Sequence, residues 1–188
     1  KKMIIDAQTV FGFWRMKNIN ISIEQLLKVA KAHGVDKMLS LSTRGFLYDY
    51  EQGNDETLEM SRRYDEIIPV ATVDLRRYFG CLEEVEKRYK QGFKIFRFFR
   101  DYCEWPVHYA PFLKILKELN KFRIPMMIDV GVCKGIVTQL AEVSKGLDVP
   151  ILLTEVSYDN LSEIFFAAQD NPNLYIATRT LCTPDEVE

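Results

Sequence analysis

Seven short apolar runs, separated by longer segments with helical spacing, dominate the pattern of hydrophobic and polar positions along the chain. The runs predict buried β-strands. They are Met3–Ala7, Lys37–Ser42, Ile67–Val73, Phe93–Phe99, Ile124–Asp129, Pro150–Glu155 and Asn173–Thr178. Their ends recur at intervals of roughly 25 to 35 residues, which is about the length of one βαβ unit. The pattern therefore predicts a strand followed by a helix, repeated along the chain.

The segments between the runs carry helix start and stop signals. Ser22 with Gln25 three residues later has the spacing of a capping box, and Gly34 predicts the end of the same helix. Further helices are predicted over Asn54–Tyr64, Leu82–Lys90, Pro111–Phe122, Ile136–Lys145 and Leu161–Gln169. Strand and helix therefore alternate throughout.

Apolar strands that alternate with amphipathic helices predict an α/β fold with a parallel sheet, either doubly wound or closed into a barrel. The turn expected after the first strand, Gln8–Trp14, has no glycine-rich phosphate-binding pattern of the doubly wound folds. Seven units, with an eighth interrupted after a helix start at Thr183–Glu186, favour a (β/α)8 TIM-type barrel. We expect one barrel domain over residues 1–188 that is incomplete, with about seven strands and the last unit missing at the C-terminus; an open sheet is the alternative.

Composition narrows the function classes. The formal net charge is −2 and no block of Lys or Arg stands out, so we expect neither nucleic acid nor a membrane as partner, and favour a small-molecule substrate. No apolar run approaches the roughly 20 residues needed to span a bilayer. The 4 cysteines show no C-x-x-C spacing, which predicts reduced thiols and a cytoplasmic protein.

In a barrel the working residues lie at the C-terminal ends of the strands and in the loops that follow them. Asp129 and Glu155 each end an apolar strand. Two such carboxylates could bind a hard cation or act as general acid and base. The alternative is an internal ion-pair network with Arg97 and Arg179, because buried charges are usually paired.

Histidine is scarce, and this limits the metal chemistry. The chain has 2 histidines, His33 and His108, and neither ends a predicted strand, which excludes a three-histidine zinc site from this chain. Any metal would need oxygen ligands, from Asp129, Glu155 and Gln8 or Asp6, a set that suits Mg²⁺ or Mn²⁺ better than Zn²⁺. Cys133 next to Lys134 is interpreted as an inert thiol.

Aromatic side chains crowd the loops expected on the catalytic face, interleaved with arginines such as Arg44. They could line a pocket for a planar or carboxylated ligand, or they could form loop packing or a subunit interface. The aromatic residues concerned are Phe11, Phe13, Trp14, Phe46, Tyr48, Tyr50, Tyr78, Phe79, Tyr102 and Trp105.

Several segments resemble the amidohydrolase-related family of TIM-barrel metal-dependent hydrolases and decarboxylases, and the resemblance covers nearly the whole chain. Ile4–Gly12 is similar to the family's opening I-D-x-H-x-H-x-G motif. Gly53–Tyr64 and Pro69–Asp74 resemble its G-N…P and V-D-P region. Three further segments resemble the later strands of the family: Gly92–Arg97, Ile124–Ile128 and Pro172–Tyr175.

The resemblance implies a metal site whose usual histidines are replaced. The two first-strand histidines correspond to Gln8 and Val10, the fifth-strand histidine to Asp129, and the sixth-strand histidine to Glu155; Phe99 stands where a further histidine is frequent. Val10 cannot bind metal. The expected cofactor is therefore one divalent ion (Mn, Mg or Zn) at Gln8, Asp129 and Glu155, or no metal at all.

Two classes of function follow from the resemblance. The first is a hydrolase or decarboxylase of a small carboxylated or carbonyl-containing molecule, with Asp129 and Glu155 catalytic and the substrate bound by Arg97, Arg44, Trp14 and Arg179. The second is a catalytically inactive member that serves as a ligand-binding or structural protein. A cation near the carboxylates would support the first, and arginines that neutralise them in a closed, dry barrel would support the second. An incomplete barrel would leave a sheet edge that another copy could cover, so a homo-oligomer is possible.

Overall fold

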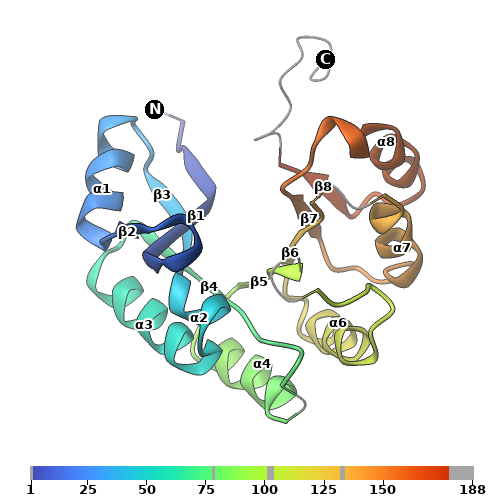
Figure 1. Ribbon diagram of the computed structural model, residues 1–188, viewed down its shortest axis with the longest axis horizontal. Coiled ribbons are helices and arrows are strands. Elements are labelled where there is room, and N and C mark those ends of the chain that lie inside the picture. Colours follow the sequence, from blue (N-terminus) through green and yellow to red (C-terminus); the bar gives the residue numbers. More distant parts are fainter. Residues whose placement is uncertain (1, 78, 101–103, 132–133, 178–188) are drawn as a thin grey trace. The chain divides into compact units, whose positions relative to one another are not determined.

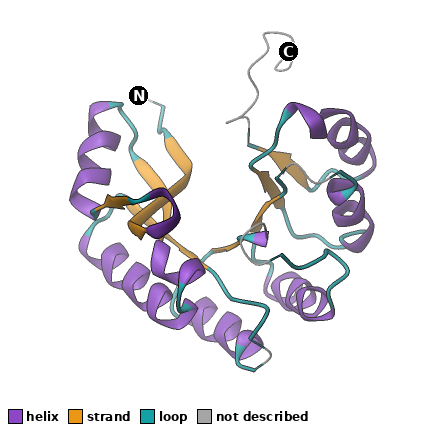
Figure 2. Ribbon diagram, viewed as in Figure 1, coloured by secondary structure: helices purple, strands orange, loops and turns teal. Residues whose placement is uncertain are grey.

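The computed structural model describes residues 2–77, 79–100, 104–131 and 134–177, which divide into two compact units. The first unit holds the described residues of Lys1–Asp74 and Glu86–Phe96, and the second those of Leu75–Val85 and Arg97–Glu188. In both, strands and helices alternate along the chain, as Figure 2 shows. The strands form a mostly parallel sheet of order β2-β1-β3-β4-β5-β6-β7-β8, which follows the chain except that β2 pairs antiparallel with β1 at the edge. The predicted strand-then-helix repeat is therefore confirmed.

The first unit begins with the longest strand. Its elements are β1 (Ile5–Trp14), a 3-10 turn η1 (Arg15–Lys17), β2 (Ile19–Ile21), α1 (Ile23–Ala32), β3 (Lys37–Ser42), α2 (Thr43–Leu47), α3 (Tyr50–Arg63) and β4 (Ile67–Ala71). It also contains the end of α4 (Cys81–Lys90) and the start of β5 (Ile95–Phe98). Strand β1 pairs with β3 in parallel and with β2 antiparallel. The prediction of a turn after the first strand is therefore wrong. Gln8–Trp14 continues β1, because β2 forms a hairpin with β1 and pairs with the last residues of β1.

The core of the first unit lies between the strands and α1. Phe11, Ile23, Ala30, Met38 and Ile67 form a buried apolar cluster. In Figure 1, α1 and α3 lie on the same side of β1 and β3. At the start of α1 the predicted capping box is present, since Gln25 N–H donates to Ser22 Oγ and Ser22 N–H donates to Gln25 Oε1. Gly34 has φ +71°, as expected for the residue that ends this helix.

The second unit contains three further strand-and-helix repeats. Its elements after β5 are α6 (Ala110–Phe122), β6 (Met126–Asp129), α7 (Ile136–Val143), β7 (Ile151–Thr154), a 3-10 turn η2 (Tyr158–Asn160), α8 (Leu161–Asp170) and β8 (Leu174–Ile176). Strands β6, β7 and β8 are parallel, and all four residues of β6 are buried. Figure 1 shows α6, α7 and α8 on one side of these strands. No helix among the described residues is long and apolar enough to span a membrane.

Candidate functional site

Four polar side chains meet at the C-terminal ends of β5, β6 and β7 in the second unit. Asp129 is the last residue of β6, and its register partner is Thr154, the last residue of β7. Arg97 lies in β5 and is 5% exposed, while Asp129 is 3% exposed. Glu155 directly follows β7. Because parallel strands end at the same edge of a sheet, residues far apart in the sequence come together here.

One carboxylate oxygen of Asp129 accepts three hydrogen bonds in this cluster. Its Oδ1 accepts from Arg97 Nε at 3.2 Å, from Arg97 Nη2 at 3.0 Å and from Thr154 Oγ1 at 2.5 Å. Among the described residues no donor reaches Oδ2. The Asp129 carboxyl is therefore held at one oxygen, and its other oxygen is left for a further contact.

Burial raises the pKa of the Asp129 carboxyl above its ordinary value. The Arg97 charge and the hydrogen bonds from Thr154 and Arg97 act in the opposite direction, while the nearby Glu155 charge also raises the pKa. A raised pKa moves a carboxyl toward the neutral range in which general acid–base catalysis is most effective.

Glu155 has an unusual backbone. Its φ is +54°, a left-handed conformation in a residue that is neither glycine nor a helix cap. Its side chain is 34% exposed, and Oε1 lies 4.0 Å from Arg97 Nη2. The Arg97 guanidinium thus contacts both carboxylates, and it also lies 4.6 Å from the centre of the Phe99 ring.

A divalent cation does not fit this arrangement. The guanidinium of Arg97 contacts both Asp129 and Glu155, so a positive charge already occupies the position where a shared metal ion would bind. Among the described residues, no group of three His, Cys, Asp or Glu side chains could hold a metal ion. Gln8, the third predicted ligand, belongs to the first unit, where its Nε2 is buried without a hydrogen-bond partner among the residues that the structure describes.

The first unit holds two of the predicted substrate-binding residues. Arg44 lies in α2, where Nε binds Glu56 Oε1 at 3.1 Å and Nη1 donates to Gln52 at 2.8 Å. Glu56 also accepts from Ser42 Oγ at 2.7 Å. These groups border a hollow of about 610 Å³ at the C-terminal end of β3, which also includes the exposed aromatics Phe13 and Tyr48. Trp14, in contrast, packs edge-on against Phe46 at 5.4 Å.

The described aromatic residues of the predicted loops fall into a buried group and an exposed group. Phe11, Phe46, Tyr50 and Trp105 are buried and belong to the packing, whereas Phe13, Tyr48 and Phe79 are exposed. Tyr78, Tyr102, Cys133 and the predicted substrate ligand Arg179 lie outside the described residues. The prediction missed Thr154 and Glu56, because only the strand register reveals the first and only the packing of α3 beside α2 reveals the second.

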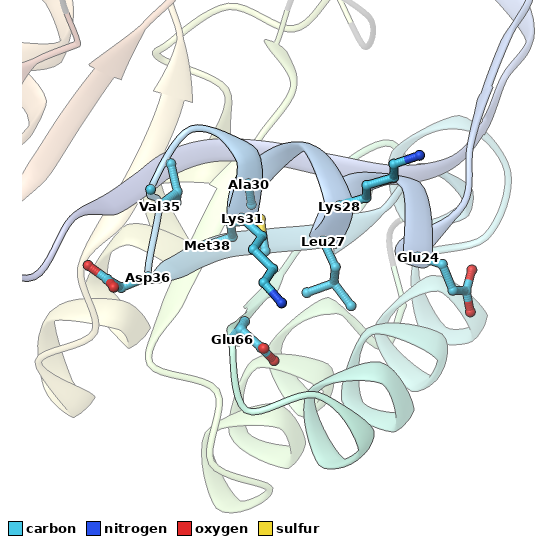
Figure 3. Close-up of a pocket in the computed structure, with 10 residues that line it drawn as sticks. Glu24, Leu27, Lys28, Ala30, Lys31, Val35, Asp36, Met38 and Glu66 are labelled. Atoms are coloured by element: carbon cyan, nitrogen blue, oxygen red, sulfur yellow. The ribbon is translucent and has the colours of Figure 1, made fainter.

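A second hollow in the first unit lies at the opposite end of β3. It measures about 630 Å³ and is bordered by α1, by Met38 near the start of β3 and by Glu66 just before β4. Figure 3 shows Lys31 pointing toward Glu66 across it, with Leu27 beside them. The N-terminal ends of barrel strands usually contribute to stability and not to catalysis, so this hollow is a weaker candidate.

Comparison with known proteins identifies the fold. No protein-family model and no curated protein sequence matches the chain. Among solved structures, a probable 2-pyrone-4,6-dicarboxylic acid hydrolase from Acinetobacter baumannii with bound citric acid aligns with a TM-score of 0.61 and 13% identity over 81% of this chain. The chain spans 58% of the length of that hydrolase.

Two further structures agree. An uncharacterised TIM-barrel protein from Bordetella bronchiseptica has a TM-score of 0.69 and 13% identity, covering 93% of this chain and 74% of its own. A dihydroxybenzoic acid decarboxylase from Polaromonas with bound manganese and 2-nitroresorcinol has a TM-score of 0.58 and 10% identity, covering 99% and 75%. These likenesses confirm the predicted (β/α)8 fold and, at the level of fold, the predicted resemblance to amidohydrolase-related proteins.

Proposed function

We propose that this chain belongs to an amidohydrolase-related enzyme, a hydrolase or decarboxylase that acts on a small carboxylated or carbonyl-containing molecule. The observation that carries the proposal is the Arg97–Asp129–Thr154 cluster beside Glu155, at strand ends where barrels of this fold place their reacting groups. The names of the structural neighbours support this substrate class, since one is a hydrolase of a pyrone dicarboxylic acid and another a decarboxylase of dihydroxybenzoic acid.

Asp129 is the proposed acid–base group. In hydrolysis its free Oδ2 takes a proton from the attacking water as oxygen bonds to the substrate carbon, and returns that proton to the leaving group when the old bond breaks. In decarboxylation the same carboxyl protonates the carbon from which carbon dioxide departs. Arg97 and Thr154 orient the carboxyl by holding Oδ1, and Glu155 borders the same position.

Substrate binding is assigned to the arginines of the prediction. Arg97 has its guanidinium beside Asp129, and Arg44, with its side chain 48% exposed, is aimed by Glu56 and Gln52. The guanidinium fork of either arginine suits a carboxylated ligand, which it can bind through two parallel hydrogen bonds. Trp14 and Arg179 stay predictions as substrate-binding residues, and a cytoplasmic location and assembly into a homo-oligomer stay predictions for the protein. The predicted divalent ion would have to displace Arg97 from Asp129 and Glu155. Because a cation does not fit beside Arg97, the proposed reaction uses side chains of the protein and no metal ion.

The direct test uses the full-length protein and two substrates, 2-pyrone-4,6-dicarboxylate and 2,6-dihydroxybenzoate, followed by ultraviolet absorbance and carbon dioxide release. We expect turnover of a substrate of this class, with kcat lowered by at least about a hundredfold in Asp129→Asn, the size of an acid–base contribution. Asp170→Asn, an exposed carboxylate on α8, is the control and should keep full activity. Full activity in Asp129→Asn would refute the role of Asp129.

Elemental analysis of the same protein separates a side-chain mechanism from a metal mechanism. The contact of Arg97 with both carboxylates predicts less than one equivalent of Mn²⁺ or Zn²⁺ after incubation with either ion and desalting. Stoichiometric metal that is lost in Asp129→Asn would show instead that Arg97 moves aside and that Asp129 is a ligand.

The second candidate is a catalytically inactive member that binds a ligand, and one observation favours it. Arg97 neutralises Asp129 in a buried ion pair, which is the arrangement expected of a structural network. Citrate and the pyrone dicarboxylate serve as probes in a thermal shift assay. Stabilisation by these ligands without turnover of either substrate would favour the binding protein over the enzyme.

A further inference from the structure

A groove between α7 and α8 in the second unit is built from residues that the proposed reaction does not use. Hydrogen bonds place the two helices side by side and parallel (Figure 1). Glu163, in the first turn of α8, accepts from the N–H groups of Gly135 and Thr138 at the start of α7, at 3.2 and 2.7 Å. Beyond the helix ends, Asn171 Nδ2 donates to Ser144 Oγ at 2.9 Å. The two C-terminal ends therefore lie together.

The groove has an apolar floor of fixed shape. It forms a hollow of about 580 Å³, within the range of ligand and anchor pockets. Leu147, Ala167 and Pro172 line it together with Phe166, which is 72% exposed and leaves most of its ring in water. Asn173 Nδ2 donates to Leu147 O at 2.8 Å, which ties the loop after α7 to the loop after α8. The groove is therefore held by hydrogen bonds before any partner arrives.

The rim of the groove is acidic. Glu142, Asp148 and Asp170 carry negative charge there, against the single positive charge of Lys145. None of these four side chains forms an ion pair within the described part of the chain. The fourth carboxylate, Glu163, is engaged by the start of α7. Three carboxylates thus share the lining of the groove with an exposed aromatic ring and one positive charge.

The two helix ends add to this negative potential. A helix carries partial negative charge at its C-terminus, which a basic residue in the last turn usually offsets. The described helices α1, α2, α3, α4 and α6 each have at least one basic residue in the last turn, whereas α7 and α8 have none. These two helix ends therefore meet at the acidic rim with no basic residue in either last turn, and Lys145 just beyond α7 is the one basic residue that lines the groove among the described residues.

We propose that the groove between α7 and α8 is a docking surface for a basic amphipathic helix of a partner protein. The apolar face of such a helix covers Phe166 and Leu147, in the way that amphipathic helices occupy apolar grooves. Its Lys and Arg side chains reach Glu142, Asp148 and Asp170 at the rim and complement the two helix ends. Charge complementarity of this kind selects the partner and rejects an acidic helix. The proposal does not depend on the proposed reaction.

The test measures binding of a fluorescently labelled synthetic helix to the full chain by anisotropy. The probe is a 15-residue peptide with leucines on one face and lysines flanking them, and a second peptide replaces every lysine with glutamate. We expect the lysine peptide alone to bind. Phe166→Ser, and separately the double variant Glu142→Lys/Asp170→Lys, should each weaken binding by about tenfold or more, as for the loss of an interface anchor.

The control is Glu83→Lys, a single charge reversal with half the charge change of the double variant, on an exposed residue of α4 that borders a different hollow. It should leave the affinity within about twofold, because Glu83 does not line the groove. Equal binding of both peptides, or equal loss in Glu83→Lys, would overturn the proposal. So would a concentration-dependent dimer in sedimentation that Phe166→Ser abolishes, since the occupant would then be a second copy of this chain.

Discussion

At the scale of single residues, the backbone of Glu155 stands out. A left-handed conformation is unfavourable for any residue with a Cβ, and such strain tends to persist where the position serves a function. Here the strained residue follows β7 and places a carboxylate near Arg97. The left-handed backbone of Glu155 therefore costs stability and directs the Glu155 carboxylate toward Arg97.

Comparison of Glu155→Gly with Glu155→Ala isolates that strain. Both variants remove the carboxylate, but only glycine relieves the left-handed backbone, so Glu155→Gly should be more stable than Glu155→Ala by about 1 kcal/mol. Urea unfolding gives the two free energies. Equal stabilities would mean that the backbone at this position relaxes at no cost, and the functional interpretation of the strain would be lost.

At the scale of the elements, the Gly53–Asn54 pair explains why α2 and α3 pack so closely. A Cβ on Gly53 would lie 2.2 Å from Gly45 N and 2.3 Å from Gly45 Cα, so two backbones approach where only glycine fits. Asn54 is buried, and its amide donates to Thr72 O at 2.9 Å and accepts from Thr72 N at 3.0 Å. The pair thus fixes α3 to α2 and to the residue after β4.

Gly53→Ala should therefore lower the free energy of unfolding by about 2 kcal/mol or more, because α2 or α3 must shift to admit the methyl group. Glu51→Ala, an exposed change on the same helix, should stay within about 0.5 kcal/mol of the parent. Thermal and urea unfolding measure both. Parental stability in Gly53→Ala would show that the close approach of the helices is not required.

Helix α4 is attached to α3 by one buried arginine. Arg88 is completely buried, and it binds Asp55 at 2.5 Å and donates to Glu51 O at 2.9 Å. Its guanidinium also lies 5.9 Å from the centre of the Phe93 ring. Since Asp55 is largely exposed, the arginine gains mainly hydrogen bonds and packing.

Arg88→Met keeps the apolar stem and removes these hydrogen bonds, so we expect a loss of about 2 kcal/mol in urea unfolding. Lys90→Met provides the contrast. Lys90 is 70% exposed and pairs with Glu86 on the surface, where such pairs contribute at most about 0.5 kcal/mol. If the two variants lost the same stability, the buried hydrogen bonds of Arg88 would contribute no more than a surface pair.

At the scale of the whole molecule, the raised pKa of Asp129 affects the pH dependence of stability. The folded state holds this proton more tightly than the unfolded state, so folding is favoured while the carboxyl is protonated. That contribution falls as the pH rises from about 4, the ordinary aspartate value, through the raised folded pKa. Stability therefore declines with rising pH over that window.

Asp129→Asn removes this ionisation, so the stability of the parent relative to Asp129→Asn should fall as the pH rises through the same window. Urea unfolding of both proteins between pH 3.5 and 8 measures the difference. A parent that gains stability relative to the variant with rising pH would show that Arg97 outweighs burial and that the pKa of Asp129 is lowered.

The sequence by itself determined the alternation of strands and helices, because that pattern depends on contacts between residues a few positions apart. The capping box at Ser22, Asp129 at the end of β6 and Glu155 directly after β7 were likewise predicted from neighbours in the chain. The Gly53–Asn54 pair was also identified in the sequence, but its role in the packing of α2 and α3 was not predicted.

Only the tertiary structure decided which of these residues meet. Arg97 and Asp129 are 32 positions apart, and Thr154 joins them because β6 and β7 share a register that no local pattern encodes. Arg44 binds Glu56 because α3 packs beside α2. Phe11 is buried because α1 packs against the strands. The pairing of strands and the packing of helices depend on burial of residues that are far apart in the sequence. For this reason only the tertiary structure shows that Asp129 and Glu155, two candidate metal ligands, both contact Arg97.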